Sequence, residues 1–231
     1  SFAHKAGLHA SALKVNPELY NHIDPALVGG DQRVLVTEMA GRASVEMKSK
    51  ELGYDITGDA ERVTHIVETV KDLESKGWTF EAADASFELI LMGSDESQSR
   101  FEVESWRTIV EQDASGDVRT EATVKVRANG ERMISTAEGN GPVNALDKAL
   151  RSAVTSLHPK LEPLELIDYK VRILEKSDAD TSGTASVTRV LVSTSDGKRE
   201  WTTLGVHENV IAASWRALED ALTYGLMRSQ A

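Results

Sequence analysis

The second half of the chain contains an internal repeat, and this repeat constrains the possible folds more than any other feature of the sequence. A shift of 68 residues superimposes the two copies, because small and apolar residues recur at the same helical spacing in both. The matched residues are Val143, Ala145, Ala149, Leu150 and Ala153 in the first copy and Ile211, Ala213, Ala217, Leu218 and Ala221 in the second. One structural unit is therefore predicted to occur twice.

Three segments rich in β-branched residues precede each of the two predicted helices. The first copy has predicted strands at 101–112, 119–128 and 132–138 and a helix at 142–157. The second copy has predicted strands at 164–176, 184–194 and 199–205 and a helix at 208–227. Asn129 and Gly130 are typical of a tight hairpin turn, and they separate the last two strands of the first copy.

This order of segments predicts a βββα-βββα domain. Each half would be a sheet covered on one face by a helix, and the two halves would be related by a pseudo-twofold axis. Half-covered units of this kind tend to pack against each other or against a second copy of the chain. We therefore expect a homodimer.

The first part of the chain has a different, mostly helical pattern. Apolar residues of 60–77 fall at helical spacing, and 79–93 is predicted to be a second amphipathic helix that ends at Gly93. The chain is therefore predicted to be α+β, with helical subdomains at 1–93 followed by the βββα-βββα regulatory and dimerisation domain at 94–231.

Charge and composition exclude several classes of function. The net charge of -11, without a run of Lys or Arg, argues against a nucleic-acid or anionic-membrane partner. No apolar stretch reaches the roughly 20 residues that span a bilayer. The absence of cysteine fits a cytoplasmic protein. Because the chain begins at Ser1 without an initiator Met, we expect it to be a fragment of a longer protein.

The stretch "EGNGPVNALDKAL" brings two glycines and a proline to the start of the first repeated helix. One interpretation is a tight turn with an asparagine cap. The other is a site for a small anion, because the first turn of a helix has free N–H groups and a partial positive charge. A nucleotide is not expected, since the stretch has no Walker lysine. The equivalent junction of the second copy, "LGVHENVIAA", lacks the pattern, but the residues alone leave both interpretations open.

Titratable residues are concentrated near the start of the chain, at His4, Lys5, His9, Tyr20 and His22. Histidines commonly transfer protons near neutral pH. Spacing alone favours partly exposed helical histidines, and it does not match a zinc-binding helix, so no metal site is predicted in this chain.

Three ordered motifs give the sequence a family resemblance. "SFAHKAGLHASALK", "LYNHIDPALVGGDQRVLVTEMAGRASV" and "EGNGPVNALDKAL" resemble the citramalate synthase branch of the α-isopropylmalate synthase family, in its C-terminal part. The resemblance implies a full-length acyltransferase that condenses acetyl-CoA with a 2-oxo acid, either pyruvate or 2-oxoisovalerate. Its TIM barrel would hold a divalent metal (Mg, Mn or Zn) through an aspartate and an H-x-H pair. This chain contains neither the barrel nor H-x-H, so it is expected to be inactive alone.

The resemblance also implies roles for individual residues. His9 and Tyr20 match residues that enter the partner subunit's active site, and they are expected to be catalytic. The regulatory domain would bind a branched-chain amino acid as feedback inhibitor, isoleucine for citramalate synthases and leucine for isopropylmalate synthases. The expected effector contacts are Gly139, Asn140, Gly141, Pro142, Val143, Leu166, Tyr169, Ile173 and Thr184. The alternative is a dimerisation scaffold that binds no effector.

Overall fold

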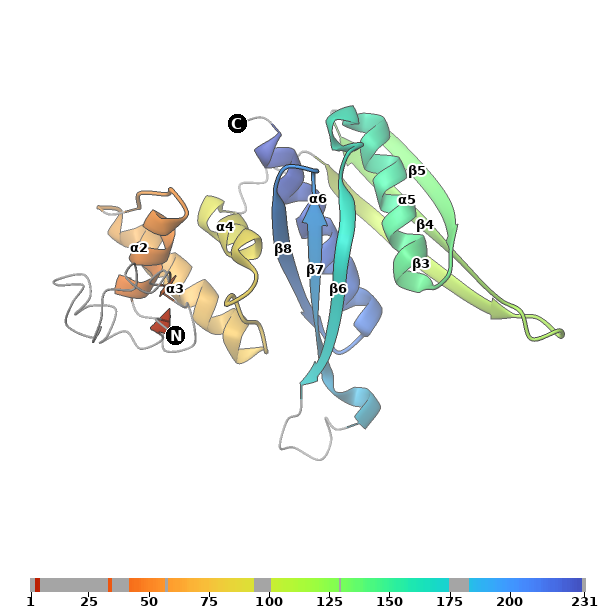
Figure 1. The fold of residues 1–231 in the computed structure, drawn as a ribbon, viewed down its shortest axis with the longest axis horizontal. Coiled ribbons are helices and arrows are strands. Elements are labelled where there is room, and N and C mark those ends of the chain that lie inside the picture. The colour runs from red at the N-terminus through yellow and green to blue at the C-terminus, as the bar shows by residue number, and fades with distance from the viewer. Residues whose placement is uncertain are drawn as a thin grey trace. The chain divides into compact units, whose positions relative to one another are not determined.

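The structure is a computed structural model that describes residues 3–4, 33–34, 42–56, 58–93, 101–128, 130–174 and 183–229. The chain divides into two compact units, Ser1–Gly93 and Ser94–Ala231. Figure 1 shows the elements of both units, and each unit is described by itself below. None of the described helices is long and apolar enough to cross a membrane.

The described part of the first unit is mainly helical. Its helices are α2 (Arg42–Glu51), α3 (Ala60–Ser75) and α4 (Asp84–Met92). Two short strands, β1 (Ala3–His4) and β2 (Arg33–Val34), form a parallel pair that the sequence analysis did not predict. Asp59 begins α3 as its N-cap, since its side chain accepts a hydrogen bond from the amide of Arg62 at 3.0 Å.

The core of this unit confirms the helix predicted at 60–77, but α4 is shorter than predicted. Val63, Ile66 and Val70 of α3 are buried in the core. The prediction of a helix from residue 79 was wrong, because α4 begins only at Asp84. The preceding turn brings the Phe80 and Phe87 rings within 6.0 Å of each other. One continuous helix would separate these positions by about 10 Å along its axis, so the turn is what brings the two rings into contact.

The second unit contains the predicted βββα order twice. The first copy comprises β3 (Glu102–Gln112), β4 (Val118–Ala128), β5 (Glu131–Gly139) and α5 (Pro142–Leu157). The second comprises β6 (Glu165–Leu174), β7 (Val187–Ser195), β8 (Glu200–His207) and α6 (Val210–Arg228). Short 3₁₀ helices lie at Pro159–Leu161 and Gly183–Ala185. The α+β class is thereby confirmed, while the pseudo-twofold axis stays a prediction.

Each copy folds as an antiparallel three-stranded sheet, in the orders β3-β4-β5 and β6-β7-β8. Figure 1 shows α5 against the first sheet and α6 against the second. The central strands β4 and β7 bury alternate valines, such as Val124 and Val192, on their helix-facing side. Small helix residues such as Ala149 and Ala217 are fully buried opposite them, so the repeated alanines bring each helix close to its sheet.

The hairpin turn of the first copy follows the predicted chemistry. Gly130 has a positive φ of 80°, and Ala128 pairs with Glu131 across the hairpin, whereas Asn129 lies outside the described residues. In the second copy the Asp196 side chain accepts hydrogen bonds from the amides of Lys198 and Arg199. The copies also contact each other, because the Trp106 ring of β3 stacks on Trp215 of α6 with centroids 5.4 Å apart.

Candidate ligand-binding site

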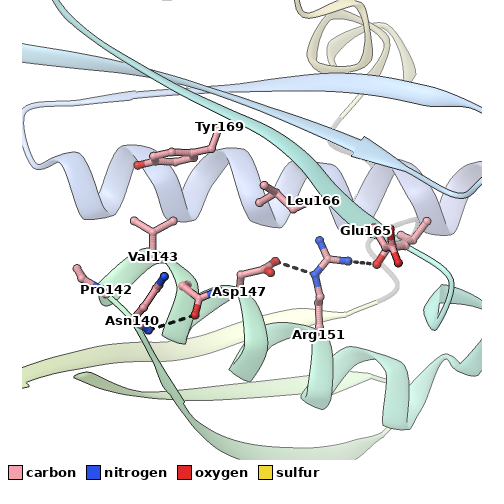
Figure 2. Close-up of a pocket in the computed structure, with 11 residues that line it drawn as sticks. Asn140, Pro142, Val143, Asp147, Arg151, Glu165, Leu166 and Tyr169 are labelled. Carbon is pink, nitrogen blue, oxygen red and sulfur yellow. Dashed lines mark hydrogen bonds and ion pairs between the residues drawn. The ribbon is translucent and has the colours of Figure 1, made fainter. Parts of the chain in front are cut away.

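A cavity of about 650 Å³ lies at the start of α5. Two segments form it, the first turns of α5 with the residues just before them, and the beginning of β6 with the residue before it (Figure 2). The residues that line it are Asn140, Gly141, Pro142, Val143, Asn144, Asp147, Arg151, Leu164, Glu165, Leu166 and Tyr169. The structure therefore brings six of the nine predicted effector contacts to one cavity.

The two glycines of the "GNGP" stretch have different structural surroundings. A Cβ atom on Gly139 would lie 2.5 Å from the amide nitrogen of Ala145 and 2.8 Å from Oδ1 of Asn144. In the second copy a Cβ atom on Gly205 would lie 2.0 Å from the carbonyl oxygen of Ala213. Gly139 and Gly205 thus both permit the last residues of a strand to approach the following helix. Packing alone accounts for Gly139, which does not line the cavity.

Gly141 has no comparable structural requirement. Its φ of -176° and ψ of 171° describe extended backbone that any residue can adopt. A Cβ atom built on it has no heavy atom within 4 Å. Gly141 does, however, line the cavity. The absence of a side chain here keeps open a space beside the first turn of α5.

The starts of the two repeated helices also differ in capping. Asn209 caps α6 by accepting hydrogen bonds from the amides of Ile211 at 2.8 Å and Ala212 at 3.2 Å. The equivalent position of α5 is Gly141, which has no side chain to cap with. The amides of Val143 and Asn144 belong to the first turn, so they lack intrahelical acceptors and carry the positive partial charge of the helix N-terminus. They could donate to a ligand in the cavity.

The apolar part of the cavity comes from both copies of the repeat. Val143 of α5 faces Leu166 and Tyr169 of β6 in Figure 2. The hydroxyl of Tyr169 shares a hydrogen bond with Ser214 of α6 at 2.7 Å, which holds the ring over the cavity. These three side chains form a wall suited to an aliphatic group.

Two of the predicted contacts lie away from this cavity. Ile173 is four residues beyond Tyr169, which places it about 13 Å further along the extended strand β6. It is 61% exposed. Thr184 belongs to the 3₁₀ helix before β7 and is also exposed. Their part in ligand binding stays a prediction.

Charged side chains in the cavity were not predicted from the sequence. Arg151 donates from Nε to Oδ1 of Asp147 at 2.7 Å and from Nη1 to the carbonyl oxygen of Leu164. Glu165 is the third charged residue of the lining. Burial raises the pKa of the Asp147 carboxyl, and Arg151 acts in the opposite direction. The i, i+4 spacing of Asp147 and Arg151 was the available sequence signal, but it is equally typical of a solvated helix face.

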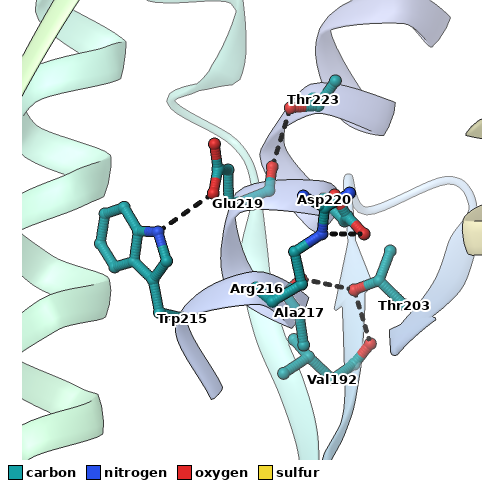
Figure 3. Close-up of polar contacts among 8 residues, drawn as sticks. All are labelled: Val192, Thr203, Trp215, Arg216, Ala217, Glu219, Asp220 and Thr223. Carbon is teal, nitrogen blue, oxygen red and sulfur yellow. Dashed lines mark hydrogen bonds and ion pairs between the residues drawn. The ribbon is translucent and has the colours of Figure 1, made fainter. Parts of the chain in front are cut away.

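The polar side chains of α6 make contacts within the second copy instead (Figure 3). Thr203 of β8 donates to the carbonyl oxygen of Ala217 at 2.7 Å, and Arg216 pairs with Asp220 at 3.2 Å. Burial raises the pKa of Asp220 to about 7; Arg216 lowers it and Glu219 raises it further. None of these residues lines the cavity. Two charged side chains of α5 therefore line the cavity, whereas those of α6 in Figure 3 do not.

The predicted catalytic residues His9 and Tyr20 lie outside the described part of the chain, and their roles stay predictions. Within that described part, no group of three or more His, Cys, Asp or Glu side chains could hold a metal ion. The metal implied by the family resemblance therefore has no ligand set among these residues.

Two family models match the chain. Residues 81–226 match the LeuA allosteric (dimerisation) domain, and residues 1–77 match the homocitrate synthase post-HMGL domain-like family. The first match covers the cavity and both repeated units.

Individual relatives extend over nearly the whole chain. It is 62% identical over 231 residues to a protein named (R)-citramalate synthase from Streptomyces coelicolor, covering 99% of this chain and 42% of the relative. It is 41% identical to a protein of the same name from Aquifex aeolicus, covering 100% of this chain and 43% of the relative. A protein named 2-isopropylmalate synthase from Acetivibrio thermocellus is 28% identical, with 96% of this chain and 40% of the relative covered. The chain thus spans about two fifths of the length of these relatives.

Proposed function

We propose, since the chain belongs to the LeuA allosteric (dimerisation) domain family, that it is the regulatory part of a citramalate synthase. In this proposal its cavity at α5 binds a branched-chain amino acid. Isoleucine is the proposed effector, acting as a feedback inhibitor. The names of the relatives at 62% and 41% identity favour citramalate synthase over 2-isopropylmalate synthase, the name of the relative at 28%.

The single observation that carries the proposal is the combination of Gly141 with the uncapped start of α5. Neither backbone conformation nor packing requires glycine at this position. The effect of a glycine here is to leave the first-turn amides open to the cavity. A carboxylate at these amides would receive hydrogen bonds and the favourable field of the helix.

The remaining wall fits the other end of such a ligand. Val143, Leu166 and Tyr169 supply apolar surface in the same cavity as the helix start. Burying a four-carbon aliphatic group there would contribute roughly 1.5–3 kcal/mol to binding. A branched-chain amino acid combines a carboxylate with an aliphatic group of this size.

For the full-length protein we propose a cytoplasmic, homodimeric acyltransferase that condenses acetyl-CoA with pyruvate. His9 and Tyr20 would act in its active site, and the divalent metal would bind in a barrel outside this chain. Allosteric control requires that the effector bind one arrangement of the regulatory dimer better than the other. The second hypothesis is a scaffold that holds the dimer together and leaves the cavity empty.

The substitution Val143→Asp tests the proposal. It places a negative charge beside the expected carboxylate and removes apolar surface, but it lies on a partly exposed residue and should leave the fold intact. We expect calorimetry to show isoleucine binding to the wild-type chain and none to the variant, with the same sedimentation for both. Equal affinity in the two proteins would place the effector elsewhere, and no binding to a wild-type dimer would favour the scaffold hypothesis.

A further inference from the structure

The charged residues of the cavity restrict which charges a ligand can carry, and neither the helix start nor the apolar wall does so to the same extent. Asp147, Arg151 and Glu165 line it, and their formal charges sum to minus one. A ligand with only negative charge meets a net repulsion from this lining, whereas a ligand that also carries an ammonium group meets an attraction. The apolar wall cannot make this distinction, because a 2-oxo acid and the corresponding amino acid share the same alkyl chain and carboxylate.

Asp147 lies on α5 about one helical turn beyond the first-turn amides that are proposed to bind the carboxylate. It follows Val143 by about one turn on the same face of α5, and both side chains line the cavity (Figure 2). Asn144, three residues before Asp147, also lines it. One turn rises about 5.4 Å. The carboxylate and ammonium groups of one α-amino acid, each with its own hydrogen bond, can bridge this span.

Arg151 holds the Asp147 side chain in place and leaves part of it available. Its Nε donates to Oδ1 of Asp147 at 2.7 Å, while its Nη1 anchors it to the carbonyl oxygen of Leu164. Among the residues that the structure describes, Oδ2 of Asp147 has no hydrogen-bond partner, and the side chain is 15% exposed. The second oxygen can therefore accept a hydrogen bond from a ligand.

We propose that Asp147, positioned by Arg151, selects α-amino acids over the 2-oxo and 2-hydroxy acids of the same carbon skeleton. This inference rests on the proposed function, since it concerns the same cavity. Asp147 contacts the ammonium group, the first-turn amides of α5 contact the carboxylate, and Val143, Leu166 and Tyr169 contact the alkyl chain.

Calorimetric titration of the full chain with three probes tests the inference. The probes are L-isoleucine, 3-methyl-2-oxopentanoate and 2-hydroxy-3-methylpentanoate. We expect the wild-type chain to bind isoleucine at least about 10-fold more tightly than either analogue, as a charge-assisted hydrogen bond requires. Asp147→Asn, which keeps the shape and removes the charge, should weaken isoleucine binding by about 10-fold or more and bind the analogues no more weakly than wild type does.

Asp220→Asn is the matched control. It removes the carboxylate of an Arg–Asp pair with the same spacing of four residues, on α6, from a residue that does not line the cavity. We expect it to bind isoleucine with wild-type affinity, and weakened binding in this control would show that the loss in Asp147→Asn is not specific to the cavity.

The possible failures are distinguishable. If the wild-type protein binds the 2-oxo analogue as tightly as isoleucine, the cavity does not select amino acids. The wild-type titration alone is then enough to overturn the inference. Unchanged isoleucine affinity in Asp147→Asn, or an equal loss for all three probes, would also overturn it while the proposed function stands. Absence of isoleucine binding to the wild-type chain would overturn the proposed function and the inference together.

Discussion

Gly139 and Gly141 are two residues apart, yet the structure predicts opposite consequences for replacing them with alanine. In Gly139→Ala the new Cβ atom meets the amide nitrogen of Ala145 at 2.5 Å, its Cα at 2.9 Å and Oδ1 of Asn144 at 2.8 Å. Two of these atoms are backbone atoms of α5 and cannot move without shifting the helix. In Gly141→Ala the new atom meets nothing within 4 Å.

The magnitudes follow from these contacts. Overpacking of this kind costs about 1–3 kcal/mol, and the backbone clash places Gly139→Ala toward the upper end. Gly141→Ala introduces no strain and restricts the unfolded chain, so it should stabilise the protein by about 0.4–1 kcal/mol. We therefore expect the free energies of unfolding of the two variants to differ by about 3 kcal/mol. For a chain of this length this corresponds to a difference in Tm of about 6–12 °C.

Urea titration followed by tryptophan fluorescence measures this difference, since three of the four tryptophans, Trp106, Trp201 and Trp215, lie in the relevant unit, and Trp78 lies in the other. Wild-type protein provides the reference for both variants. If Gly141→Ala proves as destabilising as Gly139→Ala, Gly141 has a structural role that neither its backbone conformation nor its surroundings indicate. The central support for a ligand at the start of α5 would then be lost.

Two further predictions concern α6. Asn209→Ala removes the cap from the amides of Ile211 and Ala212 and should lower the free energy of unfolding by about 1 kcal/mol in a urea titration; no change would mean that water caps this helix equally well. The free energy of unfolding should depend on pH through Asp220. The pKa of this group is about 7 in the folded chain and 3.8 when unperturbed, so the folded state holds the proton more tightly. Stability should fall as pH rises from about 4 to 7, by at most about 4 kcal/mol from this group, and then stay level. Asp220→Asn should lack this decrease when free energies of unfolding are compared at pH 4 and pH 8, and equal slopes in the two proteins would refute the assignment to Asp220.

The repeated architecture could be predicted because its signals are local. Alternating β-branched residues, turn residues and alanines at helical spacing each specify a short segment, and their repetition shows that one unit occurs twice. The start of α4 could not be predicted in the same way. Phe80 fits a helical pattern, but its ring packs against Phe87 through a turn, and tertiary packing of this kind overrides local periodicity.

The candidate site was predictable only in part, for a physical reason. The "GNGP" stretch identifies a helix start from residues that are adjacent in sequence. The pairing of Asp147 with Arg151 at a cavity depends on Leu164, the residue just before β6, whose carbonyl oxygen anchors the arginine. Without knowledge of which face of α5 is covered, these two residues resemble an ordinary surface ion pair.

A crystal structure of the chain with L-isoleucine bound would show whether the cavity at the start of α5 is the effector site. We expect density in the cavity at α5, with the carboxylate at the amides of Val143 and Asn144 and the alkyl chain against Leu166 and Tyr169. Isoleucine bound at another place, or an empty cavity at saturating ligand, would contradict this expectation.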